Sequence, residues 1–154
     1  HNEWGLDHGC WSVLNPMFPA ANIPVFQLSI DYYQQPQYHY ELAQELKALR
    51  KKGVLIIGSG NIVQNLRLFT MQDVAFDWAI EFDTKIKELL EKGDHTPIIN
   101  YKTLGKAAEL SVPTNDHYLP LLYTIALQEK NESLRFFNDK TTAGSISMRS
   151  LIIG

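Results

Sequence analysis

Hydrophobic positions in the first part of the chain form two short continuous runs separated by a helically spaced stripe. Residues 23–30 are apolar and rich in strand formers, and residues 54–57 are continuously apolar, as in a parallel strand buried on both faces. Residues 38–49 place Leu42, Ala43, Leu46 and Leu49 on one helical face, and Gly53 ends this helix. The order strand, helix, strand predicts an α/β fold with a central, mostly parallel or mixed sheet flanked by helices.

The remaining sequence continues the alternation of helices and strands. The pattern predicts helices over residues 72–92, 96–110 (interrupted by Gly105) and 118–128, and closing strands over residues 133–137 and 147–153. The sequence shows no internal repeat, low-complexity tract or long linker. We therefore expect a single domain over residues 1–154.

Composition narrows the classes of function. The 154 residues are 45% hydrophobic and 20% charged, and 14 basic against 17 acidic residues give a formal charge of −3. This balance offers no basic excess for binding nucleic acid or an anionic membrane, and no apolar run reaches the roughly 18 residues of a membrane span. Cys10 is the single cysteine, which excludes an intrachain disulfide and favours a reducing, cytoplasmic setting.

The first residue is His1 rather than methionine, so we expect the chain to be the C-terminal portion of a longer protein. On this expectation, parts of a functional site would lie in sequence that precedes residue 1. His39, among tyrosines, and His95, after Gly93 and Asp94, are expected to be solvated surface residues.

Three segments carry residues suited to chemistry, and the first is WGLDHG at residues 4–9. It places His8 between Asp7 and a glycine in a segment expected to be irregular. An imidazole there can accept or donate a proton. The alternative is that the Asp7 and His8 side chains only satisfy the hydrogen bonds of a turn.

The second segment is the glycine turn GSGN at residues 58–61, directly after an apolar run, where open α/β sheets bind their ligands. A dinucleotide fingerprint would need glycine where Val63 stands, and the Gly-Lys-Ser/Thr of a phosphate-binding loop is absent, so both nucleotide interpretations fail. The turn instead presents Asn61, Gln64 and Asn65. A purely structural turn is the alternative.

The third segment contains His117, shortly before Pro120. Proline fits the first turn of a helix, so His117 is expected at the mouth of the following helix rather than inside it. A neutral imidazole at this place can bind a divalent metal through one nitrogen while an acceptor orients the other. Capping of the helix by His117 remains an equal alternative.

Taken together, the segments resemble the LigB-type extradiol dioxygenases, in the branch of 4,5-DOPA dioxygenase-like proteins. The matching motifs are WGLDHG at 4–9, WS at 11–12, PV at 24–25, QLS at 27–29, GSGN at 58–61, NLR at 65–67, VPT at 112–114 and DHYLPL at 116–121. They occur in the family's order and cover almost the whole chain. The resemblance implies a LigB-like fold, incomplete in this chain, and ring opening of a catechol such as DOPA with O₂ and non-haem Fe(II) or Zn(II).

The resemblance also assigns roles to individual residues. It implies that His117 is a metal ligand, that His8 is a catalytic and substrate-binding histidine, and that Ser59 and Asn61 bind substrate. We therefore expect His8 and His117 to face one cleft, with the glycine turn beside them.

Two departures from the family pattern weaken this assignment. Gln64 stands where the family has an acid/base histidine, and the family's two further metal-binding histidines lie in an N-terminal half that this chain lacks. We expect this fragment to be inactive alone. A non-catalytic module that binds a small molecule or a protein is the alternative, and a homo-oligomer stays open.

Overall fold

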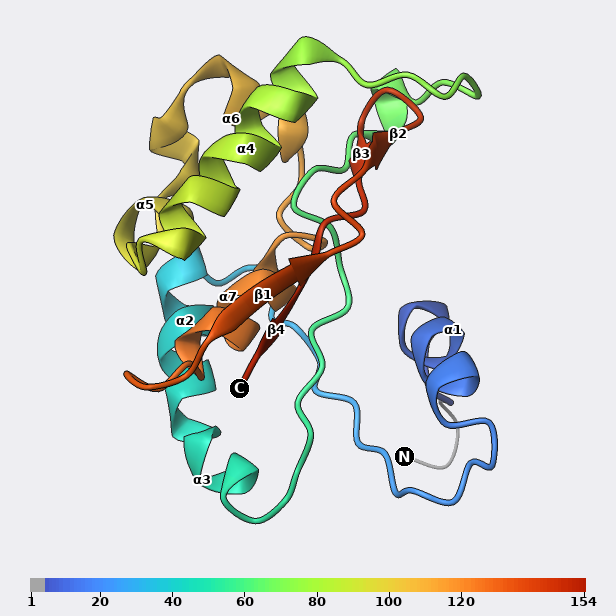
Figure 1. Cartoon of the computed structure of the whole chain (residues 1–154), viewed down its shortest axis with the longest axis vertical. Helices are drawn as coiled ribbons and strands as arrows, with labels where there is room; N and C mark the ends of the chain where they lie inside the picture. Colours follow the sequence, from blue (N-terminus) through green and yellow to red (C-terminus); the bar gives the residue numbers. More distant parts are fainter. Residues whose placement is uncertain (1–4) are drawn as a thin grey trace.

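The computed structural model describes residues 5–154 and combines helices with short strands, which confirms the α/β class (Figure 1). The helices are α1 (His8–Met17), α2 (Pro36–Glu45), α3 (Lys47–Arg50), η1 (Leu66–Leu68), α4 (Asp77–Glu91), α5 (His95–Ile99), η2 (Tyr101–Leu104), α6 (Lys106–Ser111) and α7 (Leu119–Ala126). The strands are β1 (Leu134–Phe137), β2 (Thr141–Thr142), β3 (Ile146–Ser147) and β4 (Ser150–Ile153). In residues 5–154, no helix is long and apolar enough to cross a membrane.

The helices predicted from apolar stripes are confirmed, with shifted ends. The stripe over 38–49 forms α2 and α3, and the stripes over 72–92 and 118–128 form α4 and α7. The predicted interruption at Gly105 separates η2 from α6, and its φ of +89° is a conformation that glycine adopts without strain.

The main core lies where α4, α5, α6 and α7 pack together. Its largest fully buried side chains include Phe82, Ile86, Ile98, Leu119 and Leu122. Tyr118 is also fully buried, and its hydroxyl donates to the Ile98 carbonyl at 2.9 Å. A second cluster joins α2 to α7 through Ala43, Tyr123 and Ala126.

The closing strands are also confirmed, and they form an antiparallel pair. Strand β1 pairs with β4 in the register Leu134 to Ile153 and Phe136 to Leu151. Strands β2 and β3 form a second, two-residue antiparallel ladder. The ladders within residues 5–154 are thus antiparallel and lie at the C-terminal end of the chain.

The central sheet expected from the sequence is not formed by the part of the chain that the structure describes. Residues 23–30 and 54–57, predicted as its strands, run as unpaired segments with no assigned strand. The physical reason is that a strand is stabilised by pairing with its neighbours, and within residues 5–154 neither segment pairs with another strand. The prediction of a βαβ unit is therefore wrong for residues 5–154, although its helix is correct.

The segment around His8 is helical, where an irregular loop was expected. Asp7 is the N-cap of α1, and its Oδ1 accepts a hydrogen bond from the Cys10 amide at 2.8 Å. Helix α1 stands apart from the other helices, on the far side of the chain that follows α3 (Figure 1). None of its residues is buried.

The expectation of a solvated surface residue is wrong for His39, and His95 is half-buried rather than fully exposed. His39 is fully buried, with Nδ1 at 3.0 Å from the Tyr123 hydroxyl, and His95 Nδ1 lies 2.8 Å from the Tyr40 hydroxyl. The Nε2 atom of each ring is buried without a partner in residues 5–154. Both contacts fix α2 to the body of the domain, because Tyr40 and His39 belong to this helix.

These two histidines predict a loss of stability in mild acid. Burial lowers the pKa of His39 and of His95 below the ordinary value of 6.5. The unfolded chain therefore binds protons more readily, so the free energy of unfolding should decrease as the pH falls below 6.5. Urea unfolding between pH 7.5 and 5.5 measures this, and the double variant His39→Gln, His95→Gln should show a flatter pH dependence. If the free energy of unfolding of the double variant depended on pH as steeply as that of the unaltered chain, the two histidines would not be the cause.

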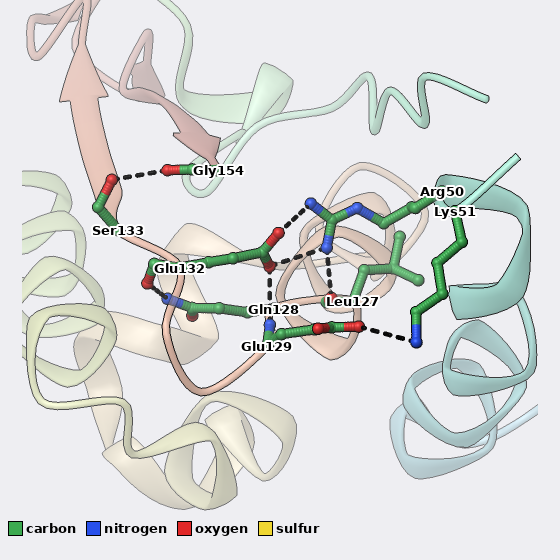
Figure 2. A network of polar contacts seen from close by, with 8 residues as sticks. All are labelled: Arg50, Lys51, Leu127, Gln128, Glu129, Glu132, Ser133 and Gly154. Carbon is green, nitrogen blue, oxygen red and sulfur yellow. Dashed lines mark hydrogen bonds and ion pairs between the residues drawn. The ribbon is translucent and has the colours of Figure 1, made fainter. Parts of the chain in front are cut away.

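A polar network ties the end of α3 to the chain between α7 and β1 (Figure 2). Arg50 donates to both carboxylate oxygens of Glu132, at 2.8 and 2.5 Å, and to the Leu127 carbonyl at 2.8 Å. Glu132 also accepts from the Glu129 amide at 2.8 Å. Arg50 holds the pKa of Glu132 below its ordinary value, chiefly through their side-chain hydrogen bonds.

We expect Arg50→Ala to lower the free energy of unfolding by about 1–3 kcal/mol, because a two-pronged, charge-assisted contact and a carbonyl partner are lost. The neighbouring pair of Lys51 and Glu129 is a matched control, since its atoms are 3.9 Å apart and both side chains are largely exposed. Lys51→Ala should change little. Urea unfolding at pH 7 compares the two variants, and equal losses would refute the importance of the Arg50 contacts.

Candidate functional site

The glycine turn at residues 58–61 lies directly against the start of α7. A Cβ atom on Gly60 would be 2.1 Å from the His117 carbonyl oxygen, and one on Gly58 would be 2.5 Å from the Pro120 carbonyl oxygen. The Asn61 amide donates to the His117 carbonyl at 2.8 Å. Glycine is needed here for close approach of two backbones, which fixes the turn beside His117.

The same turn also contacts the N-terminal end of α1. The Ser59 hydroxyl donates to the Gly9 carbonyl at 2.9 Å, and His8 is the first residue of this helix. Asp7 anchors the helix start to residues 23–30, because its backbone amide donates to Gln27 Oε1 at 3.0 Å and its carboxylate accepts from Gln27 Nε2. One short turn therefore lies between the segment that carries His8 and the segment that carries His117.

His117 is at the mouth of α7, as its spacing from Pro120 predicted. Its side chain is 44% exposed, and its Nε2 lies 3.4 Å from Asp116 Oδ2. The next residue, Tyr118, is the N-cap of α7 and is locked in the core, where burial raises its pKa well above the ordinary value. The buried tyrosine thus fixes the backbone that presents the histidine to solvent.

Asp116 was missed as a site residue at the level of sequence. Its position directly before His117, in a loop that caps a helix, was the available signal. A carboxylate beside an imidazole can orient the ring and set its tautomer.

Gln64 follows the glycine turn and lies among buried residues. The backbone amide of Gln64 donates to the Ser111 carbonyl at 2.9 Å. The side-chain oxygen Oε1 is buried without a hydrogen-bond partner in residues 5–154. The Ser111 hydroxyl is also buried and has no hydrogen-bond partner in the part of the chain that the structure describes. The side chain of Gln64 therefore brings an unsatisfied polar group next to the glycine turn. Its side-chain amide cannot gain or lose a proton near neutral pH as a histidine ring does.

The two asparagines of the turn hold the local structure together. Asn61 Nδ2 donates to the Ser147 carbonyl at 2.9 Å, and Asn65 Nδ2 donates to the Leu110 carbonyl at 2.7 Å. Asn65 is buried, so the expectation that the turn presents it as a free polar group is wrong. Val63 is fully buried where a nucleotide fingerprint would require glycine.

The donors of residues 5–154 do not fit a complete metal site. Within this part of the chain, no three His, Cys, Asp or Glu side chains are grouped as a metal would need. His117, with Asp116 beside it, is a partial donor set, whereas catalytic divalent metals are usually held by about three protein ligands.

Comparison with known proteins identifies the family from nearly the whole chain. Residues 1–144 match the family model described as the catalytic LigB subunit of aromatic ring-opening dioxygenase. The chain belongs to the LigB family. Extradiol dioxygenases of this family use a non-haem metal to open aromatic rings, in agreement with the motifs found in the sequence.

Individual LigB relatives support the same assignment. The chain is 38% identical to a 4,5-DOPA dioxygenase extradiol of Escherichia coli K12, over 98% of this chain and 57% of that protein. It is 33% identical to one of Beta vulgaris, over 95% and 55%. A crystal structure of an uncharacterized E. coli K12 protein superposes with a TM-score of 0.88 at 36% identity, over 96% of this chain and 62% of that one. The chain thus spans little more than half the length of these relatives.

Proposed function

We propose that this chain supplies part of the active site of an extradiol dioxygenase that opens a catechol ring, such as that of DOPA, with O₂ and a non-haem divalent metal. The observation that carries the proposal is the glycine turn, which contacts Gly9 through Ser59 and His117 through Gly60 and Asn61. Two segments that are about 110 residues apart in the sequence are thereby brought to one turn, and each carries a histidine.

The roles follow from the chemistry of each side chain. His117 would hold the metal through the ring nitrogen that does not face Asp116. His8 would accept a proton from a catechol hydroxyl, for which an imidazole is suited near neutral pH. Ser59 and Asn61 would hydrogen-bond the substrate from the turn.

Gln64 would lie at the family's acid/base position and would orient substrate by hydrogen bonding without transferring a proton. The donors of residues 5–154 do not complete a metal site, so His117 alone of the described residues would hold the metal. The single cysteine, Cys10, is free and supports a cytoplasmic setting.

A second candidate function is favoured by Gln64 alone. A LigB-like domain without its acid/base histidine would keep the polar turn and bind a small molecule or a protein without opening a ring. The two candidates differ in metal dependence, since a binding module needs no divalent metal for its affinity.

We expect the 154-residue chain alone to bind divalent metal weakly and to show no ring-opening activity, because residues 5–154 offer one proposed histidine ligand of the roughly three required. Dialysis of the Fe(II)- or Zn(II)-loaded chain followed by elemental analysis measures this, with His117→Ala as the control. Residual binding should decrease in the control. Tight, equimolar metal in the unaltered chain after dialysis would contradict the proposal.

A further inference from the structure

A pocket of about 230 Å³ lies between the chain that precedes α2, the start of η2 and the loop that precedes α7. Its lining residues come from 32–35, 101–102 and 112–115. Tyr32 and Tyr33, whose ring centres are 5.9 Å apart, give it aromatic walls that suit an organic ligand. The volume is smaller than that of pockets that enclose a whole drug-sized ligand, so the pocket fits one end of a small molecule.

The buried polar group of this pocket is the hydroxyl of Tyr101. Only 2% of Tyr101 is exposed, and its ring packs on Tyr118 with centres 4.6 Å apart. The Tyr118 hydroxyl donates to the Ile98 carbonyl, whereas the Tyr101 hydroxyl makes no hydrogen bond within residues 5–154. Burial raises the pKa of Tyr101 above its ordinary value, so the hydroxyl stays protonated and can donate. Buried tyrosine hydroxyls usually have a partner, so this one indicates an acceptor bound in the pocket.

The charge of the pocket favours an anion as that acceptor. Lys102 lines it, is exposed, and forms no ion pair in the part of the chain that the structure describes. The other described lining residues are uncharged, and Gln34, Thr114 and Asn115 among them can donate hydrogen bonds. One lysine balances the single negative charge of a carboxylate, whereas a phosphate group carries close to two charges at neutral pH.

The loop that lines the pocket also leads to His117. Two backbone hydrogen bonds hold its ends against residues 61–64, from the Gln64 amide to the Ser111 carbonyl at 2.9 Å and from the Asn61 amide to the His117 carbonyl at 2.8 Å. Asn115 lines the pocket two residues before His117, which limits the separation of their Cα atoms to about 7 Å. A single molecule of the size of DOPA can therefore reach from His117 to the pocket.

We propose that this pocket binds the carboxylate of a substrate whose catechol ring lies at His117. The Tyr101 hydroxyl donates a hydrogen bond to the carboxylate, and Lys102 supplies the balancing charge. The assignment of the carboxylate to a substrate rests on the proposed function, and it names the substrate class as catechols with a carboxylate on their side chain. Tyr101 and Lys102 then determine specificity and take no part in ring opening.

Binding to the 154-residue chain alone tests the proposal without metal or O₂. DOPA and dopamine, which differ only in the carboxylate, are titrated into the isotope-labelled chain under argon and followed by NMR. We expect DOPA to bind about tenfold more tightly and to shift the signals of residues 101–102 and 112–115. A higher ionic strength should reduce the difference between the two ligands.

Variants of the two residues separate recognition from folding. Tyr101→Phe should lower the affinity for DOPA about fivefold and leave that for dopamine unchanged. Its free energy of unfolding should also be unchanged, because the hydroxyl has no partner within residues 5–154. Lys102→Met should lower the affinity for DOPA about two- to fivefold. Lys92→Met is the matched control, because Lys92 is exposed at the end of α4 and does not line the pocket.

Three results would overturn the proposal. They are equal affinities for DOPA and dopamine, a loss in Lys92→Met as large as in Lys102→Met, or displacement of DOPA by an equal concentration of acetate or inorganic phosphate. The last would make the pocket a general anion site. A chain that discriminates DOPA from dopamine as expected, but opens no ring when combined with the portion of the E. coli relative that it does not match, would support the carboxylate pocket and count against the proposed function alone.

Discussion

Gln64→His should raise the rate of ring opening by about 10²–10⁴-fold in a complex of this chain with the portion of the E. coli relative that it does not match, because a positioned acid/base group typically contributes this much. Gln64 lies after the glycine turn, and its buried Oε1 has no hydrogen-bond partner among residues 5–154. A histidine at position 64 could donate or accept a proton, whereas the side-chain amide of glutamine can only form hydrogen bonds. Turnover of DOPA by the chain complexed with the unmatched portion of the E. coli relative measures the effect.

The pH profile distinguishes proton transfer from a change in packing. The histidine variant should acquire a dependence of kcat on pH in the range where imidazole titrates, and the glutamine form should lack it. Gln72→His is the control, because it adds an imidazole on an exposed loop outside the glycine turn. Equal turnover by the glutamine and histidine forms would show that proton transfer at position 64 is not limiting.

Asp83→Ala should lower the free energy of unfolding by about 3–5 kcal/mol, the usual cost of leaving one buried charge without its partner. Asp83 of α4 accepts from Arg149 Nε and Nη2 at 2.9 and 2.7 Å and from the Ser147 hydroxyl at 2.5 Å. Both charged side chains are at least nine-tenths buried. Arg149 also lies 5.5 Å from the ring centre of Phe136, so the contact joins α4 to the β1–β4 pair.

An exposed ion pair provides the matched control for this loss. Asp73 accepts from Lys140 at 2.8 Å, but both side chains are more than half exposed. Asp73→Ala should therefore have little effect. Urea unfolding at pH 7 compares the variants, and the double variant Asp83→Leu, Arg149→Met should recover part of the loss because no unpaired charge remains. Equal losses in Asp83→Ala and Asp73→Ala would refute the role of the buried pair.

Helices α4 and α7 could be predicted from the sequence because each buries its apolar stripe within residues 5–154. Helix α4 illustrates this, since Phe82 and Ile86 on its stripe are buried in the core. Residues 23–30 carry an equally clear strand pattern, yet pairing depends on a neighbouring strand, which no local pattern supplies. The α1 helix was missed, although Asp7 in front of it is a strong N-cap signal.

For the candidate site, spacing predicted the place of His117 because Pro120 fixes where α7 can begin. The contact between the glycine turn and His117 could not be predicted, since it depends on how α7 packs against a segment more than 50 residues away. His39 and His95 were misjudged for a similar reason. Their tyrosine partners lie 84 and 55 residues away, so composition around each histidine gave no indication of burial.

O₂ uptake driven by DOPA tests most directly whether this chain carries part of a ring-opening site. The Fe(II)-loaded complex of the chain with the unmatched portion of the E. coli relative should consume O₂ and ring-opened product should form in equimolar amounts. The same result is expected of the Gln64→His complex. In that complex His117→Ala should abolish O₂ uptake, because the proposed metal ligand is removed. Unchanged O₂ uptake and metal content in His117→Ala, or no uptake by the metal-loaded Gln64→His complex, would contradict the account.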